Sequence, residues 1–399
     1  MIRITIIICL AETLGMTGFA AFPTLLPQFF GEWGISNTEA GWINGIYYAG
    51  YVFAVIILTS LTDRAAPRDI YLFSTAISAI ACLGFAYLAE GFWTAMAFRT
   101  LGGIGLAGTY MPGLKMLSDF LHGPKKSRAV AFYTSSFGIG TSVSIVATGV
   151  LTDLTDWRTA FALLALGPLL AILATIFLVP RIKHDKEAAH TPTTHVLDFR
   201  PVLRCRAAMA YVLGYTVHNF ELFAFRAWTV AFLVYAASLD DDINLPISII
   251  MLAAIVNLFG VPASILGNEF ALKLGRHRWI TLIMLTSSVL ACMIGFSTAW
   301  SIWLVIGLCC LYSMTITADS AALTAGAVEA APPGYLGATM AVHSSIAFTG
   351  SFLGPLVFGI MLDVNSSGGS SASWAVAFIV MGLVGLSGPL LMRWVGKDA

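Results

Sequence analysis

Seven ionisable side chains lie inside stretches of this sequence that are otherwise apolar enough to cross a lipid bilayer. A charge at membrane depth is costly, so such residues usually face a bundle interior or a water-filled path and serve the movement of ions or substrates. Their presence therefore points to transport chemistry. The seven residues are Glu12, Arg99, His218, Glu221, Arg226, Asp319 and His343.

His218 and Glu221 have the residue types and the spacing of a proton-binding site. They are three residues apart, so on a helix they share one face. A carboxyl group beside an imidazole in a water-poor environment can bind and release a proton near neutral pH. A purely structural hydrogen-bond network between helices is the alternative interpretation of the same pair.

Arg99 and Arg226 are candidates for contact with a substrate. A buried arginine needs a carboxylate, backbone carbonyls or a substrate anion as its partner. With a rise of about 1.5 Å per residue, Glu12 lies about 10 Å from the inner membrane boundary and Arg99 about 9 Å from the outer one. A direct pair between them would need extended side chains or water, so we expect Glu12 to face the cavity and to handle protons.

Asp319 and His343 are further candidates for proton coupling, as a gate or a second proton step. A hydrogen bond between neighbouring helices explains them equally well. Tyr48 belongs to an aromatic patch and Asn257 lies in an apolar run, so both are candidate substrate contacts. Packing against lipid or core is the more frequent fate of such tyrosines.

The composition requires a membrane protein built of helices. The chain is 58% hydrophobic and only 11% charged, and its mean hydropathy is +0.85. In a soluble domain, about a quarter of all residues would be charged. We therefore predict an all-α membrane protein with twelve spans. The predicted spans are 4–30, 40–61, 69–89, 93–120, 128–151, 158–180, 207–237, 245–271, 279–297, 299–326, 336–362 and 374–394.

The basic residues predict how these spans are oriented. If the N-terminus is cytoplasmic, most of the 21 Lys and Arg residues fall in cytoplasmic segments. The positive-inside rule then places both termini in the cytoplasm. The longest connection, 181–206, is polar and charged, and it divides the chain into bundles at 1–180 and 207–399.

An internal repeat supports this division. The stretch from Gly149 to Asp153 recurs from Gly359 to Asp363, and in each case a Trp-x-x-Ala-Phe segment, at 157–161 and at 374–378, opens the next span. Both copies close a fifth span and open a sixth. Two parallel repeats of six helices around a central cavity are a known plan of secondary transporters.

The loop from Leu61 to Arg68 resembles the signature loop of the major facilitator superfamily. Its Asp63-Arg64 core and Arg68 match the family pattern, whereas Thr59, Ala66 and Pro67 stand where the pattern has other residues. The resemblance implies a conformational latch formed by Asp63, Arg64 and Arg68. A degenerate copy from Gly267 to Arg276 occupies the matching place in the second half. The alternative is a solvated turn that obeys the positive-inside rule.

The family resemblance covers nearly the whole chain and extends to span four, where Arg99 and Gly103 fit an Arg-x-x-x-Gly pattern. It implies two six-helix pseudo-symmetric bundles that rock around a site formed by spans one, four, seven and ten. The family's antiporter signature in span five is absent, because Ser136-Phe-Gly138-Ile-Gly140 lacks the proline. We therefore favour proton-coupled uptake of a small, possibly anionic, organic solute.

Two other functions stay open at this point. Buried acids also suit a proton-coupled drug or metabolite efflux antiporter, and a non-transporting membrane sensor can use the same scaffold. The sequence has no phosphate-binding loop of the Gly-x-x-x-x-Gly-Lys-Ser/Thr type. We expect no enzyme activity, metal, cofactor or nucleic-acid partner, with the proton gradient as the energy source. The expected protein is a monomer in the cytoplasmic membrane.

Overall fold

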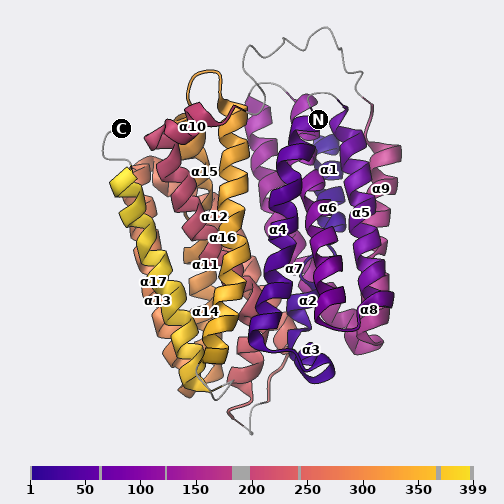
Figure 1. The fold of residues 1–399 in the computed structure, drawn as a ribbon, viewed down its shortest axis with the longest axis vertical. Helices are drawn as coiled ribbons and strands as arrows, with labels where there is room; N and C mark the ends of the chain where they lie inside the picture. Colours follow the sequence, from indigo (N-terminus) through magenta and orange to yellow (C-terminus); the bar gives the residue numbers. More distant parts are fainter. Residues whose placement is uncertain are drawn as a thin grey trace. The chain divides into compact units, whose positions relative to one another are not determined.

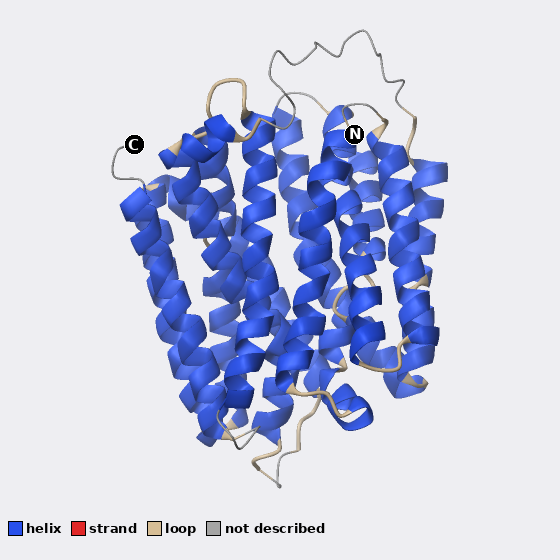
Figure 2. Cartoon of the chain, viewed as in Figure 1, coloured by secondary structure: helices blue, strands red, loops and turns tan. Residues whose placement is uncertain are grey.

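The computed structural model describes residues 2–62, 65–121, 124–181, 198–240, 244–364 and 370–395. These residues are nearly all helical, and none of them lies in a β-strand (Figure 2). Ten segments among them are long and apolar enough to cross a membrane. The prediction of an all-helical membrane fold is therefore confirmed.

Figure 1 labels the helices in chain order. The first part of the chain contains α1 (Ile2–Gly15), α2 (Ala21–Thr24), α3 (Leu26–Trp33), α4 (Asn37–Leu61), α5 (Pro67–Leu88), α6 (Phe92–Asp119), α7 (Pro124–Leu154), α8 (Trp157–Leu164) and α9 (Leu166–Leu178). The second part contains α10 (Arg200–Arg204), α11 (Arg206–Ala237), α12 (Ile249–Leu274), α13 (Arg276–Phe296), α14 (Ile302–Thr317), α15 (Ser320–Glu329), α16 (Leu336–Val364) and α17 (Ser371–Val395).

The span predicted at 158–180 is divided at Ala165 into α8 and α9, and two further predicted spans are interrupted near candidate site residues. The span predicted at 4–30 is divided into α1, α2 and α3, with a non-helical turn between Gly15 and Ala21. The span predicted at 299–326 is divided at Ala318 and Asp319, between α14 and α15. Each break frees backbone groups that must find partners inside the protein, since lipid offers none. The latter two breaks lie beside candidate site residues, as described below.

The contacts divide the chain into two compact units. Unit 1 comprises Met1–Ala21 and Ala49–Asp198, and unit 2 comprises Phe22–Tyr48 and Phe199–Ala399. The domain boundaries predicted from the sequence, at 1–180 and 207–399, thus differ from this grouping for residues 22–48. The difference arises because the first half of α4 packs on α16.

Small residues make this packing possible. A Cβ atom on Gly41 would lie 2.7 Å from the carbonyl oxygen of Pro355, and one on Gly45 would lie 2.5 Å from that of Phe352. At the start of α4, the Asp363 carboxylate accepts hydrogen bonds from the backbone N–H of Thr38 at 2.7 Å and from the Asn37 side chain at 2.8 Å. A carboxylate satisfies free N–H groups at a helix start and complements the helix dipole.

Replacing Gly45 by alanine is expected to destabilise unit 2 by about 1–3 kcal/mol, because the added methyl group has no room against the α16 backbone. The matched control is Gly307→Ala in α14, where a new Cβ would meet nothing within 4 Å. That change should be neutral or stabilising by about 0.5–1 kcal/mol. Denaturant titration of both variants in mixed micelles measures the difference. Equal effects of the two substitutions would contradict this close packing.

Candidate functional site

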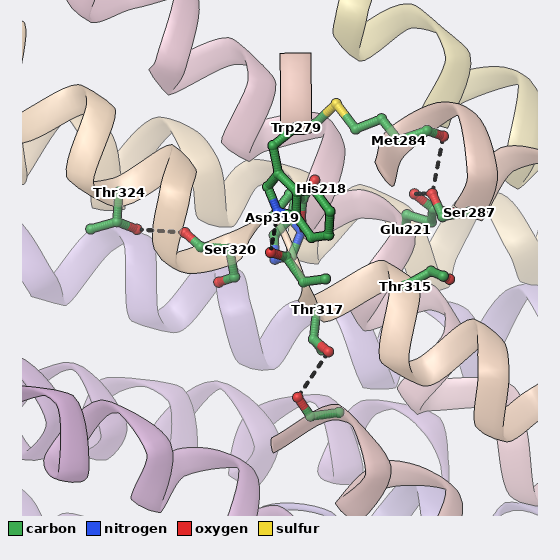
Figure 3. A network of polar contacts seen from close by, with 12 residues as sticks. His218, Glu221, Trp279, Met284, Ser287, Thr315, Thr317, Asp319, Ser320 and Thr324 are labelled. Carbon is green, nitrogen blue, oxygen red and sulfur yellow. Dashed lines mark hydrogen bonds and ion pairs between the residues drawn. The ribbon is translucent and has the colours of Figure 1, made fainter. Parts of the chain in front are cut away.

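A buried contact between an imidazole and a carboxyl group connects α11 to the break between α14 and α15. The Nδ1 atom of His218 lies 2.8 Å from Oδ1 of Asp319, and both side chains are almost fully buried. Ala318 and Asp319 separate α14 from α15, and Asp319 directly precedes the first residue of α15. The break between the helices therefore positions its carboxylate. Figure 3 shows His218 and Asp319 pointing toward each other. The structure thus brings together two of the sequence-predicted proton-coupling residues.

A tyrosine joins His343 to this pair. The ring of Tyr215 stacks on His343 with centroids 4.4 Å apart, and it also stacks on His218 at 5.1 Å. Nε2 of His343 lies 3.4 Å from the Thr324 hydroxyl. Tyr215 therefore lies between the two histidines, and it was not a predicted site residue. The signal for it was its position three residues before His218, one turn away on the same face of α11.

Glu221 has partners of its own. Its carboxylate accepts hydrogen bonds from the Tyr312 hydroxyl at 2.7 Å and from the Ser287 hydroxyl at 3.1 Å. These partners lie on α14 and α13, and Ser287 is labelled beside Glu221 in Figure 3. His218 and Glu221 are thus both buried on α11, but the structure gives them different partners. Neither Tyr312 nor Ser287 was singled out by the sequence, because both are more than sixty residues away.

Arg226 lies beside an aromatic group that includes the predicted substrate contact Tyr48. Its guanidinium carbon is 5.5 Å from the centre of the Phe223 ring, and the Tyr48 ring is 4.6 Å from the same ring. A guanidinium near an aromatic face is attracted by the ring quadrupole. The other predicted substrate contact, Asn257, is buried on α12. Arg226 and Tyr48 therefore share one neighbourhood within unit 2.

Unit 1 contains a buried carboxyl group of its own. Glu12 on α1 is 1% exposed and accepts a hydrogen bond from the Tyr133 hydroxyl at 3.0 Å. Its other oxygen, Oε1, is buried without a hydrogen-bond partner, and so is the hydroxyl of Tyr71. Unsatisfied buried oxygens are costly when the carboxyl is ionised. Glu12 is thus held in unit 1 by a hydroxyl group.

Arg99 reaches the break that follows α1. Its Nη1 atom donates a hydrogen bond of 3.0 Å to the carbonyl oxygen of Phe19, and the side chain is buried. The interrupted first helix thus supplies a backbone acceptor for Arg99. Glu12 accepts its hydrogen bond from Tyr133. Arg99 fixes the non-helical turn as well as carrying a positive charge in the bundle.

The predicted latch is described only in part. Asp63 and Arg64 lie outside the described residues. Arg68 is buried on α5, where its Nη2 atom donates hydrogen bonds to the carbonyl oxygens of Thr175 at 3.2 Å and Ile176 at 3.0 Å. Arg68 therefore satisfies carbonyl groups at the end of α9. In the described part of the chain, no three His, Cys, Asp or Glu side chains gather as a metal ion would require.

A family model provides the first comparison with known proteins. The model described as Major Facilitator Superfamily matches residues 8–318. This chain belongs to the major facilitator superfamily. The resemblance inferred from the signature loop is thereby confirmed, and the protein is a member of a family of membrane transporters.

Several curated members of the superfamily resemble this chain over part of their length. Protein spinster of Drosophila melanogaster is 20% identical over 278 residues, which cover 67% of this chain and 46% of that protein. The niacin transporter NiaP of Acinetobacter baylyi is 24% identical over 145 residues, covering 36% of this chain and 32% of the transporter. Protein spinster homolog 1 of Homo sapiens is 23% identical over 242 residues, which cover 58% of this chain and 45% of that protein. This chain thus spans less than half the length of each of these relatives.

Solved structures show the same fold at low identity. A bacterial homolog of the human lysosomal transporter Spinster, in an inward-facing and occupied conformation, matches with a TM-score of 0.80 and 14% identity, covering 99% of this chain and 97% of that one. The nucleoside transporter NupG matches with a TM-score of 0.73 and 14% identity, covering 99% of each chain. These matches establish the major facilitator fold.

Proposed function

We propose that this superfamily member is a proton-coupled secondary transporter that moves a small organic anion across the cytoplasmic membrane by alternating access. The observation that supports the proposal is that the buried carboxyl groups of Glu12 and Glu221 are held by hydroxyl groups, away from the guanidinium of Arg226. Arg226 lies beside Tyr48 and Phe223, whereas Glu12 and Glu221 are each held by hydroxyl groups. Within the described residues, neither of these carboxyl groups pairs with Lys, Arg or His.

The two kinds of site have different functions in this proposal. A carboxyl group that is buried without a cation is most stable when protonated, so its charge changes when water reaches it. Glu12 and Glu221 are therefore the proposed proton carriers, and the His218–Asp319 pair with His343 provides a further proton step. Arg226 and Arg99 offer positive charge to the substrate, with Tyr48 and Asn257 as polar contacts. The loop containing Asp63, Arg64 and Arg68 is the proposed latch.

The relatives support a small organic solute, because the curated names of two of them specify niacin and nucleoside transport. The distribution of basic residues supports a cytoplasmic position for both termini. The protein is proposed to work as a monomer, with no cofactor other than the proton gradient. The buried carboxyl groups also fit the second candidate, a proton-coupled efflux antiporter for cationic or lipophilic compounds.

A ligand screen separates these two candidates. The apparent melting temperature of the detergent-purified protein is measured with a panel of small organic anions and lipophilic cations at two pH values. A ligand that binds the folded state raises the melting temperature by mass action, by an amount equivalent to about 2.7 kcal/mol at a hundredfold excess over Kd. We expect stabilisation by an anion, lost in Arg226→Ala and kept in the control Arg393→Ala. Stabilisation by cations alone, abolished by Glu221→Gln, would instead establish the antiporter.

A further inference from the structure

A cavity of about 620 Å³ lies in unit 1 where α5 begins and α9 ends. α5 and α9 run side by side in Figure 1, and this place is at the end of the unit that carries the N-terminus. The cavity is open to the outside, and Phe177 on its wall is 77% exposed. Its wall combines two arginines, Arg68 and Arg181, with the apolar side chains of Leu72, Ile176, Phe177 and Leu178.

Arg68 is held rigidly in the floor of this cavity. The residue is 9% exposed, and its Nη2 atom is fixed by the carbonyl oxygens of Thr175 and Ile176. Its Nε atom is buried and has no hydrogen-bond partner in the structure. A guanidinium group presents its N–H groups as a planar fork that matches phosphate and carboxylate oxygens. The Nη2 atom of Arg68 is used by α9 and Nε is buried, so Nη1, which lies 4.0 Å from Oδ1 of Asp69, is the nitrogen left to donate to a ligand.

Arg181 supplies a second positive charge at the rim. Its side chain is 76% exposed, and its Nη2 atom lies 3.5 Å from Oδ1 of Asp69. The same Asp69 oxygen is 4.0 Å from Nη1 of Arg68. Two cations thus share one carboxylate, and an excess positive charge remains for an external anion. Because the Arg181–Asp69 pair is exposed, little energy is needed to reorient it.

We propose that this cavity binds the headgroup of an anionic phospholipid. The arginines match the phosphate oxygens, and the exposed apolar wall continues along α9 in the direction that acyl chains take from a headgroup. A free phosphate ion would use the arginines and leave the apolar wall uncovered. The combination of both surfaces in one open cavity therefore favours a lipid. This binding site shares Arg68 with the proposed latch, but it involves none of the proposed substrate contacts or proton carriers.

Lipid titration of the purified full-length chain tests the proposal. Native mass spectrometry counts bound phosphatidylglycerol, compared with phosphatidylcholine of the same acyl chains and with inorganic phosphate. We expect phosphatidylglycerol to bind at least tenfold more tightly than phosphatidylcholine, since hydrogen bonds to charged groups are the stronger class. Arg181→Gln should weaken this binding about tenfold, and the control Arg393→Gln should leave it unchanged.

A second variant distinguishes headgroup recognition from general attraction to positive charge. Arg68→Lys keeps the charge and removes the planar fork, so it should also weaken phosphatidylglycerol binding if the headgroup sits on Arg68. Should Arg68→Lys fail to fold, the Arg181→Gln result decides alone. Equal binding of the two lipids, equal losses in Arg181→Gln and Arg393→Gln, or inorganic phosphate that displaces phosphatidylglycerol completely would each overturn the proposal.

Discussion

Replacing Asp319 by alanine is expected to lower the free energy of unfolding by about 3 kcal/mol, because the change leaves a buried partner without its counter-group. Asp319 is the observed partner of the His218 Nδ1 atom at 2.8 Å. The other ring nitrogen, Nε2, is already buried without a hydrogen-bond partner. The variant would thus remove the counter-group of Nδ1 from an imidazole whose other nitrogen already has no partner. Denaturant titration in mixed micelles gives the free energy directly.

A double-mutant cycle shows whether this cost belongs to the pair. Replacing a buried ion pair by apolar residues is often neutral or stabilising, so His218→Leu combined with Asp319→Leu should recover most of the loss. Asp153→Ala is the matched control, because Asp153 is exposed and its removal should change stability by less than about 0.5 kcal/mol. A double variant as unstable as the sum of its single variants would show that the two side chains act independently.

Glu221→Gln is expected to abolish proton-driven accumulation of the substrate while leaving substrate exchange intact. Glutamine keeps the size of the side chain, and its single carbonyl oxygen can accept from Tyr312 while its NH2 group donates to the Ser287 hydroxyl, but it cannot gain or lose a proton. A pH difference of one unit is worth about 1.4 kcal/mol per coupled proton, or about tenfold accumulation. In proteoliposomes with a pH difference of one unit, the variant should therefore not accumulate substrate above the external concentration.

Exchange measured in the same vesicles is the internal control for folding and binding. In the variant, counterflow of labelled substrate without a pH gradient should continue at a rate close to that of the unmodified protein. Glu90→Gln serves as the matched substitution, since Glu90 is exposed. Undiminished accumulation by Glu221→Gln would remove Glu221 from the coupling mechanism. Loss of both activities would assign it a role in substrate binding or stability instead.

Some features of this protein were determined by the sequence alone. The high mean hydropathy and the small charged fraction leave only a helical membrane fold, and the signature loop indicates the correct family. The sequence also identifies the ionisable residues at membrane depth, because each of them lies within an otherwise apolar stretch. Six of these seven residues are buried in the structure, and the seventh, Arg226, is partly buried beside an aromatic ring.

Only the tertiary structure decided which of these residues meet. His218 and Asp319 are about a hundred residues apart, and the spacing along one helix favoured Glu221 as the neighbour of His218. Periodicity gives the face of a side chain, but helix rotation, depth and breaks are set by packing against other helices. The turn after α1 and the break at Asp319 place Arg99 and His218 with partners that no local pattern contains. The grouping of residues 22–48 with unit 2 likewise depends on contacts of Gly41 and Gly45 with a distant helix.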